Sequence, residues 1–218
     1  MVALGGTIKD APPNVRGFDK SVAIASLAEA QGYYNQGFRF CLRYLSLGAR
    51  QAHNDLSSLE ASWILQAGLA LMPVQHVRFS PWDPNGPLGT QTGAHATSNA
   101  INVGFPSGVN VWLDLEGIRT GTNTQDVINY CNSCYAQVAA AGYIPGIYVG
   151  FNCILDSNQL YSDLKFKHYW RAGGNIPDIA TRGYQMIQHI PSDPNDDIDT
   201  NITQKDKLGG QVLWLTQQ

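Results

Sequence analysis

The sequence predicts an α/β protein that folds as a TIM-like (β/α) barrel in a single domain. Strand-like and helix-like segments alternate along the 218 residues, with about eight strand segments in all, and this alternation is typical of a closed parallel barrel. An open doubly wound sheet would carry a glycine-rich phosphate loop after its first strand, and the chain contains neither GxGxxG nor GxxxxGKS/T. Residues 1–13 are rich in Gly and Pro and predict a lead-in, and residues 14–218 are expected to form the barrel domain.

The predicted strands are short apolar or β-branched runs bounded by turn residues. They cover residues 15–19, 37–45, 69–75, 109–117, 144–150, 167–172, 184–189 and 196–201, with Pro73 near the exit of the third strand. The tail GGQVLWL could add one more strand, whose place in the sheet the sequence does not predict.

The predicted helices lie between these strands, at residues 21–34, 57–66, 94–103, 126–141 and 158–164. The first has an apolar stripe at helical spacing. The second opens with the capping box Ser57-x-x-Glu60 and is followed by Gly68. Residues 76–93 are a long polar stretch that contains Trp82, and we expect them to form an active-site loop.

The composition excludes some partners. A net charge of −3 and only 14% charged residues leave no basic patch for nucleic acid. No N-terminal signal pattern occurs, and no run approaches the roughly 18 apolar residues of a membrane-spanning helix. A protein that meets a cell wall would therefore be secreted, periplasmic or delivered by a route that needs no such signal, and a cytoplasmic location is also compatible with the sequence. The oligomeric state cannot be read from the sequence.

We expect no metal ion and no cofactor. Cys41 lies in an apolar strand, and Cys131 and Cys134 form a CxxC inside a predicted helix, so these cysteines are expected to be structural. A zinc site would need a second CxxC or a His pair. The five histidines form no HxH, HxxxH or HExxH motif, and the GxSxG elbow of serine hydrolases does not occur.

The segment VNVWLDLEG, residues 109–117, carries the strongest functional signal. Asp114 and Glu116 are two residues apart, so in a strand their side chains point to the same side. Parallel barrels build their active sites at the carboxyl ends of the strands, where this pair would project together. Paired carboxyl groups in a cleft are the usual means of cleaving a glycosidic bond.

Further polar residues recur where the predicted strands end. They are Asp19, Arg43, Tyr44, Gln75, Tyr148, Trp170, Gln188 and Asp199. Asp19 by itself fits a helix cap as well as it fits catalysis. Four acids from three separate strands would repel one another and so keep a proton available near neutral pH. The same acids could instead hold a divalent metal ion through oxygen ligands.

The chain resembles a known family in the order and spacing of its motifs. These are GFD (17–19), FRFCLRYLS (38–46), LxxLEAxxIxxAGLxLMPV (56–74), VWLDLEG (111–117), IPGIYVG (144–150), YW (169–170), YQMIQH (184–189) and IDTN (198–201). Together they are similar to the glycoside-hydrolase-like barrel domains related to the family-25 lysozymes. The loop 76–93 and the long helix motif resemble the glycoside-hydrolase-like branch more than the lysozymes proper.

This resemblance implies a (β/α) barrel that acts on, or binds, bacterial cell-wall glycan. It implies that Glu116 is the general acid and that Asp114, Asp19 and Asp199 occupy the positions of the family's other acids. Tyr148 and Trp170 would line the sugar subsite.

The expected function is therefore hydrolysis of the peptidoglycan strand, between N-acetylmuramic acid and N-acetylglucosamine. Glu116 would protonate the leaving oxygen, and Asp114 or Asp19 would activate water or stabilise the oxocarbenium-like transition state. The residues expected to bind substrate are Asp199, Tyr148, Trp170, Gln188, Arg43, Tyr44, Gln75 and Trp82.

Two other hypotheses use the same barrel. A non-catalytic glycan- or cell-wall-binding module is the main alternative, because a fold does not determine a function. A pure binder does not need the pair Asp114 and Glu116, so the pair favours an enzyme. A toxin-like effector or a phage lysin would differ in its delivery rather than in its chemistry.

Overall fold

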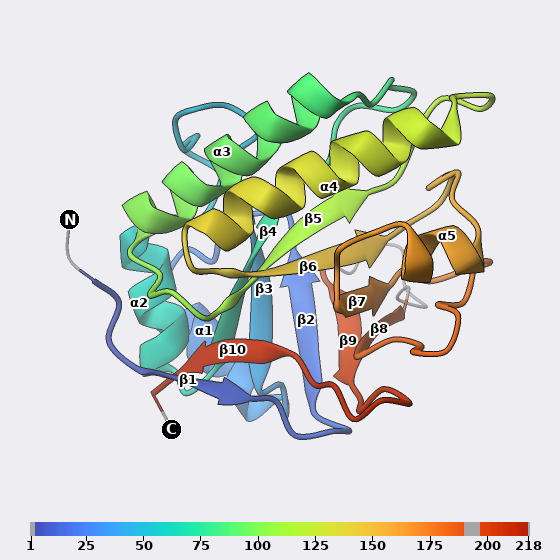
Figure 1. Ribbon diagram of the computed structural model, residues 1–218. Helices are drawn as coiled ribbons and strands as arrows, with labels where there is room; N and C mark the ends of the chain where they lie inside the picture. Colours follow the sequence, from blue (N-terminus) through green and yellow to red (C-terminus); the bar gives the residue numbers. More distant parts are fainter. Residues whose placement is uncertain (1–2, 190–196, 218) are drawn as a thin grey trace.

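Eight strands close into a barrel in the computed structural model, which describes residues 3–189 and 197–217 (Figure 1). Around the barrel they are β2 (Arg16–Lys20), β3 (Phe40–Leu45), β4 (Ala70–Gln75), β5 (Asn110–Leu115), β6 (Ile144–Val149), β7 (His168–Arg171), β8 (Met186–His189) and β9 (Asp199–Thr203). The sheet closes through pairing of β4 with β5, and the predicted TIM-like barrel is confirmed.

The expectation that all barrel strands are parallel is wrong for the last one. β9 runs antiparallel to both of its neighbours, β2 and β8. Only residues 190–198 separate β8 from β9, and a parallel connection needs a crossover of about a dozen residues or more. β9 therefore begins at the end of the barrel where the other strands finish. Residue 196 of the predicted strand lies outside the described residues.

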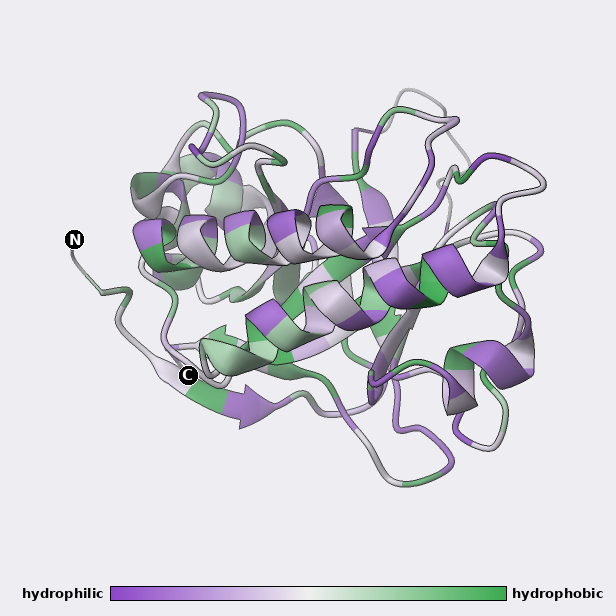
Figure 2. Cartoon of the chain, turned by 45° about the horizontal axis from the view of Figure 1, so that its top comes forward, coloured by the Kyte–Doolittle hydropathy of each residue, from purple (hydrophilic) through white to green (hydrophobic). Residues whose placement is uncertain are grey.

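Five helices cover the outside of the barrel in the described parts of the chain. They are α1 (Leu27–Asn35), α2 (Ser58–Gln66), α3 (Gly86–Val103), α4 (Thr124–Ala140) and α5 (Ser157–Ser162). α3 and α4 lie side by side over β4, β5 and β6 in both views (Figures 1 and 2). None of the helices in the described ranges is both long and apolar enough to cross a membrane.

The start of α1 differs from the prediction because local capping decides it. α1 begins at Leu27, where the Ser26 side chain accepts a hydrogen bond from the Glu29 backbone N–H. α2 begins as expected, with Ser57 capping the backbone N–H of Glu60. The Glu60 carboxylate, however, does not complete the capping box, because it accepts instead from Arg43 and from the Ile24 backbone.

α3 begins at Gly86 and not at residue 94, so residues 86–93 of the predicted active-site loop are helical. The Asn85 side chain caps the Leu88 N–H, and Pro87 lies in the first turn, where its missing N–H costs nothing. Gly89 and Gly93 disfavour a helix in this part of the sequence, but both face α4 in the structure. A Cβ on Gly93 would lie 2.7 Å from the Cys134 carbonyl oxygen. Close packing against α4 therefore overrides the low helix propensity of this segment.

Aromatic rings fill the barrel opposite glycines. A Cβ on Gly17 would overlap the ring of Phe40 in the next strand, and a Cβ on Gly146 would overlap the ring of Trp112. Trp112 also packs edge-on against Trp170, with ring centroids 5.9 Å apart. These fully buried rings form a floor under the mouth of the barrel.

The amino-terminal end of the barrel is covered by an antiparallel pair of strands (Figure 1). β10 (Leu213–Thr216) is the tail strand that the sequence did not place, and it also pairs with β4 at Leu71. β1 (Thr7–Asp10) lies within the expected lead-in and pairs with β10. Trp214 packs against Phe40 with ring centroids 5.5 Å apart, which joins this pair of strands to the barrel interior.

The contact between α3 and α4 generates a test. In Gly89→Ala the new methyl group would overlap the Tyr130 carbonyl, so the two helices must separate, and we expect the free energy of unfolding to fall by about 2 kcal/mol or more. Gly32→Ala in α1 is the matched control, because nothing lies within 4 Å of the added Cβ, and it should raise stability by about 0.5 kcal/mol. Urea unfolding measures both, and a Gly89→Ala protein as stable as the wild type would contradict this packing.

Candidate active site

Four acidic side chains meet at the mouth formed by the carboxyl ends of the parallel strands. Asp19 on β2 and Asp114 on β5 occupy inward-facing positions, and Glu116 follows two residues after Asp114. Asp199 joins them because β9 is inverted: it is the first residue of that strand and pairs directly with Asp19. The structure brings Asp199 to the same mouth as the other acids, but at the start of an antiparallel strand and not at the predicted strand end.

Asp19 is buried and held by amide groups from β8 and β9. Its Oδ2 atom accepts from the Gln188 Nε2 at 3.0 Å and from the Asn201 Nδ2 at 2.6 Å. Burial raises the pKa of Asp19 to about 7, and the charge of Asp199 adds to this rise. Hydrogen bonds from Gln188, Asn201 and Tyr44 favour the charged form and oppose the rise in pKa. Asp19 therefore changes its charge near neutral pH.

Asp114 is buried, and one of its two carboxyl oxygens has no such donor in the described parts of the chain. Among the described residues, its Oδ1 atom has no hydrogen-bond partner. Burial raises its pKa well above the ordinary value of 3.8, and the charges of Glu116 and Asp19 raise it further. Burial and an oxygen without a donor both favour the protonated form of Asp114 over the charged form.

Glu116 is half-buried and more accessible than Asp114. Its side chain lies over Gly150, where a Cβ would overlap it. Burial raises the pKa of Glu116, and the nearby charge of Asp199 contributes to the shift. Glu116 thus combines a raised pKa with a side chain that is partly exposed to solvent, as a general acid needs.

Gln188 connects the acids to one aromatic side chain. Its Oε1 accepts from the Tyr148 hydroxyl at 2.8 Å, and its Nε2 donates to Asp19 and, at 3.2 Å, to Asp199. Burial raises the pKa of Tyr148, and so do the charges of the surrounding acids, which keeps its hydroxyl available as a donor. Tyr44 also belongs to this group. Its side chain donates a hydrogen bond to Asp19, and its ring packs against His76.

Trp170 lies below the mouth rather than on its surface. It is 1% exposed and packs against Tyr148 with ring centroids 4.4 Å apart. Its indole Nε1 donates to the Asn201 Oδ1 at 2.8 Å. Trp170 therefore supports Asn201, which in turn donates to Asp19, and its ring has no open face for a sugar.

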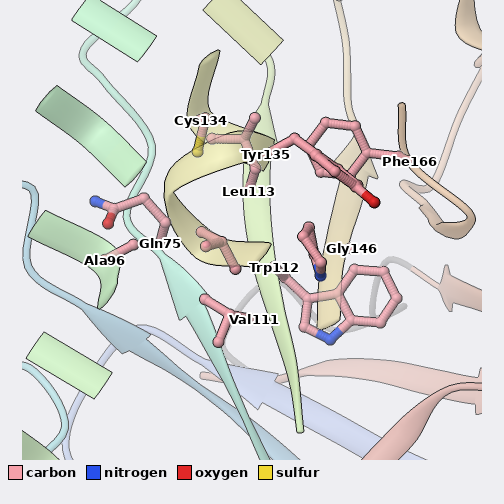
Figure 3. A pocket seen from close by; sticks show the side chains of 11 residues that line it. Gln75, Ala96, Val111, Trp112, Leu113, Cys134, Tyr135, Gly146 and Phe166 are labelled. Carbon is pink, nitrogen blue, oxygen red and sulfur yellow. The ribbon is translucent and has the colours of Figure 1, made fainter. Parts of the chain in front are cut away.

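Arg43 and Gln75 lie on the outer side of the barrel wall, because they alternate with the inward-facing Tyr44 and Val74. Arg43 is fully buried and pairs with Glu60 at 2.5 Å. Gln75 donates to the Ser46 carbonyl at 3.2 Å and, as Figure 3 shows, lies beside Ala96 in the layer between the strands and α3. Arg43 and Gln75 are expected to bind substrate, but the structure places both side chains outside the mouth of the barrel.

Trp82 also has a different place from the one expected. Its Nε1 donates to the Glu116 backbone carbonyl at 2.7 Å, and its ring packs edge-on against Tyr130 of α4. The ring is 7% exposed. Trp82 therefore holds the segment after β5 in position and does not offer its face to the mouth.

Asn201 is the residue of this site that the sequence interpretation missed. It donates to Asp19 and accepts from Trp170, and it is completely buried. The signal that could have found it is its spacing, because a residue two positions after Asp199 faces the same side of a strand. Within residues 3–189 and 197–217, no group of three or more His, Cys, Asp or Glu side chains is arranged to hold a metal ion.

An eight-stranded α/β barrel with carboxyl groups gathered at the carboxyl ends of its strands is the class of protein that these observations define. The family described as "Rv2525c-like, glycoside hydrolase-like domain" matches residues 31–206. The chain therefore belongs to this family, and the predicted resemblance is confirmed. No curated protein matches the sequence.

Several solved structures share the fold. The Tat-secreted protein Rv2525c of Mycobacterium tuberculosis has a TM-score of 0.66 at 15% identity, over 90% of this chain and 98% of its own. The catalytic domain of the endolysin ply40, from bacteriophage P40 of Listeria monocytogenes, has a TM-score of 0.58 at 15% identity, over 88% and 94%. The modular autolysin LytC of Streptococcus pneumoniae has a TM-score of 0.59 at 11% identity, over 86% of this chain and 46% of its own.

The pKa of Asp19 predicts how stability depends on pH. The folded protein binds this proton more tightly than the unfolded chain, so the free energy of unfolding contains a contribution that is lost as the pH rises from about 4 to about 7. Asp19→Asn should therefore be more stable than the wild type at pH 8, by roughly 2–4 kcal/mol. At pH 4, where Asp19 of the folded wild type is itself neutral, the two proteins should be nearly equal. Equal free energies of unfolding for the two proteins at pH 8, measured by urea unfolding, would contradict the raised pKa of Asp19.

Proposed function

We propose that the protein is a glycoside hydrolase that cleaves the glycan strand of bacterial peptidoglycan. The observation that carries the proposal is the gathering of Asp19, Asp114, Glu116 and Asp199 at one mouth, each with a raised pKa. Glycosidic cleavage needs one carboxyl group that gives a proton and a second that is negatively charged, and such a cluster supplies both.

Glu116 is the general acid in this proposal. It is more accessible than Asp114, and its raised pKa favours the protonated form that a general acid needs. Proton donation to the glycosidic oxygen lets the bond to the anomeric carbon break with a neutral leaving group.

Asp19 and Asp114 have different roles beside the sugar ring, on which a positive charge develops. The two amide donors on Asp19 favour its ionised form, so Asp19 supplies negative charge or activates water. The Oδ1 of Asp114 has no partner among the described residues and is therefore free to meet a polar group of the substrate, such as its N-acetyl amide.

Peptidoglycan is the substrate that the relatives support. An endolysin catalytic domain and an autolysin share the barrel, and the family is described as glycoside hydrolase-like. We propose the bond between N-acetylmuramic acid and N-acetylglucosamine as the one that is cut. This substrate lies outside the cytoplasm, and the description of the M. tuberculosis relative as Tat-secreted supports an exported or wall-delivered protein.

A non-catalytic glycan-binding barrel is the second candidate, and the bonding of Asp19 favours it. Two amides from neighbouring strands engage the Oδ2 of Asp19, as they would in a carboxyl group whose role is to join strands. This candidate predicts binding to cell walls without cleavage.

Substitution of Glu116 separates the two candidates. Glu116→Gln keeps the shape of the side chain but cannot donate a proton, so release of new reducing ends from purified peptidoglycan should fall by at least about 100-fold. Asp126→Asn, at an exposed acid in the first turn of α4, should keep wild-type activity.

Two outcomes would count against the assignment. Undiminished cleavage by Glu116→Gln would remove Glu116 from the chemistry. Wild-type protein that pellets with the wall and releases no reducing ends would establish the binding module instead.

A further inference from the structure

Two phenylalanine side chains are exposed beside the candidate active site. Phe79 is 98% exposed and Phe151 is 52% exposed, whereas the described aromatic side chains of the barrel interior are buried. A phenyl ring that is almost fully in water, such as that of Phe79, contributes no packing to the fold. The Phe151 ring leaves about half of its surface open to a ligand.

Phe151 lies directly next to the general acid. It follows Gly150, over which the Glu116 side chain lies. The Phe151 carbonyl accepts from the Gly117 backbone N–H at 2.8 Å, so the segments that follow β6 and β5 are joined at this point. The Phe151 ring reaches the same place, since its Cζ lies 3.5 Å from the position that a Cβ on Gly117 would occupy.

Phe79 belongs to the same rim. Its neighbour Ser80 packs on Gly117 as well, with the Ser80 Cβ 2.7 Å from the same hypothetical Cβ position. The next part of this loop is bonded to the segment after β5 through Trp82 and Glu116. The loop that carries Phe79 is thereby fixed beside Glu116.

We propose that Phe151 and Phe79 form a stacking surface for a neutral N-acetylhexosamine unit of the glycan, bound next to Glu116. This inference rests on the proposed function, because it assigns a binding role to the rim of the same mouth. An N-acetylhexosamine ring presents C–H groups on its faces, which cover a phenyl ring, and hydroxyl and amide groups on its edge.

A sugar fits these surroundings better than a purely apolar partner does. An apolar chain laid over Phe151 would remove water from Glu116 and Asp199 and offer them no hydrogen bonds, which is costly. The polar edge of a sugar replaces that water. The occupant is thus identified by one apolar face and one polar edge.

Binding can be measured without cleavage in a Glu116→Gln background. The probe is the β-1,4-linked tetramer of N-acetylglucosamine, with its affinity measured by titration calorimetry. Adding Phe151→Ala should weaken binding about tenfold, because the buried face of one aromatic ring is lost. Phe151→Trp should restore the affinity, Phe79→Ala should weaken it less, and Leu208→Ala, at an equally exposed apolar residue away from the mouth, should leave it unchanged.

The outcomes separate this inference from the proposed function. Loss of affinity in Phe151→Ala with rescue by Phe151→Trp supports the stacking surface, even for a wild-type protein that cleaves nothing. Equal affinity of Phe151→Ala, or no binding of the tetramer by the Glu116→Gln protein, overturns the stacking surface. Cleavage of peptidoglycan by the wild type would in that case leave the proposed hydrolase intact.

Discussion

The hydrogen bonds that Asp19 accepts from Gln188 and Asn201 are the interaction on which the candidate site depends. A carboxyl group buried in a barrel is costly unless donors reach it, and here Gln188 and Asn201 come from the last two strands of the barrel. Inversion of β9 places Asn201 and Asp199 at this point, because an inverted strand brings its first residues to the mouth. The topology and the charge of the site are therefore linked.

The aromatic floor completes this arrangement from below. Trp112 and Trp170 fill the barrel opposite a glycine on β6, and the Trp170 indole donates to Asn201. The Trp170 side chain thus belongs both to the apolar packing of the barrel and to the hydrogen-bond network of the acids. The floor also keeps water from below the acids, and this burial is the main reason that the pKa values of Asp19 and Asp114 rise.

Much of the mouth could be predicted from the sequence, because side chains alternate strictly along strands. The spacing of Asp114 and Glu116 suffices to place both at one end of β5. The same rule places Arg43 and Gln75 on the outer face, but only once Tyr44 and Val74 are known to face inward, and that depends on pairing between distant strands. Asn85 and Pro87 are sequence signals for the start of α3, but the glycines that follow them disfavour a helix and are explained only by the contact with α4.

The central claim is that the acids at this mouth hold their protons at pH values where ordinary carboxyl groups are charged. Carbon-13 NMR of labelled Asp and Glu carboxyl groups measures this directly, with the resonances assigned by Asp19→Asn, Asp114→Asn and Glu116→Gln. We expect the Asp19 resonance to titrate near pH 7 and those of Asp114 and Glu116 to titrate above their ordinary ranges. Titration of all three below about pH 5, as in exposed carboxyl groups, would contradict the claim.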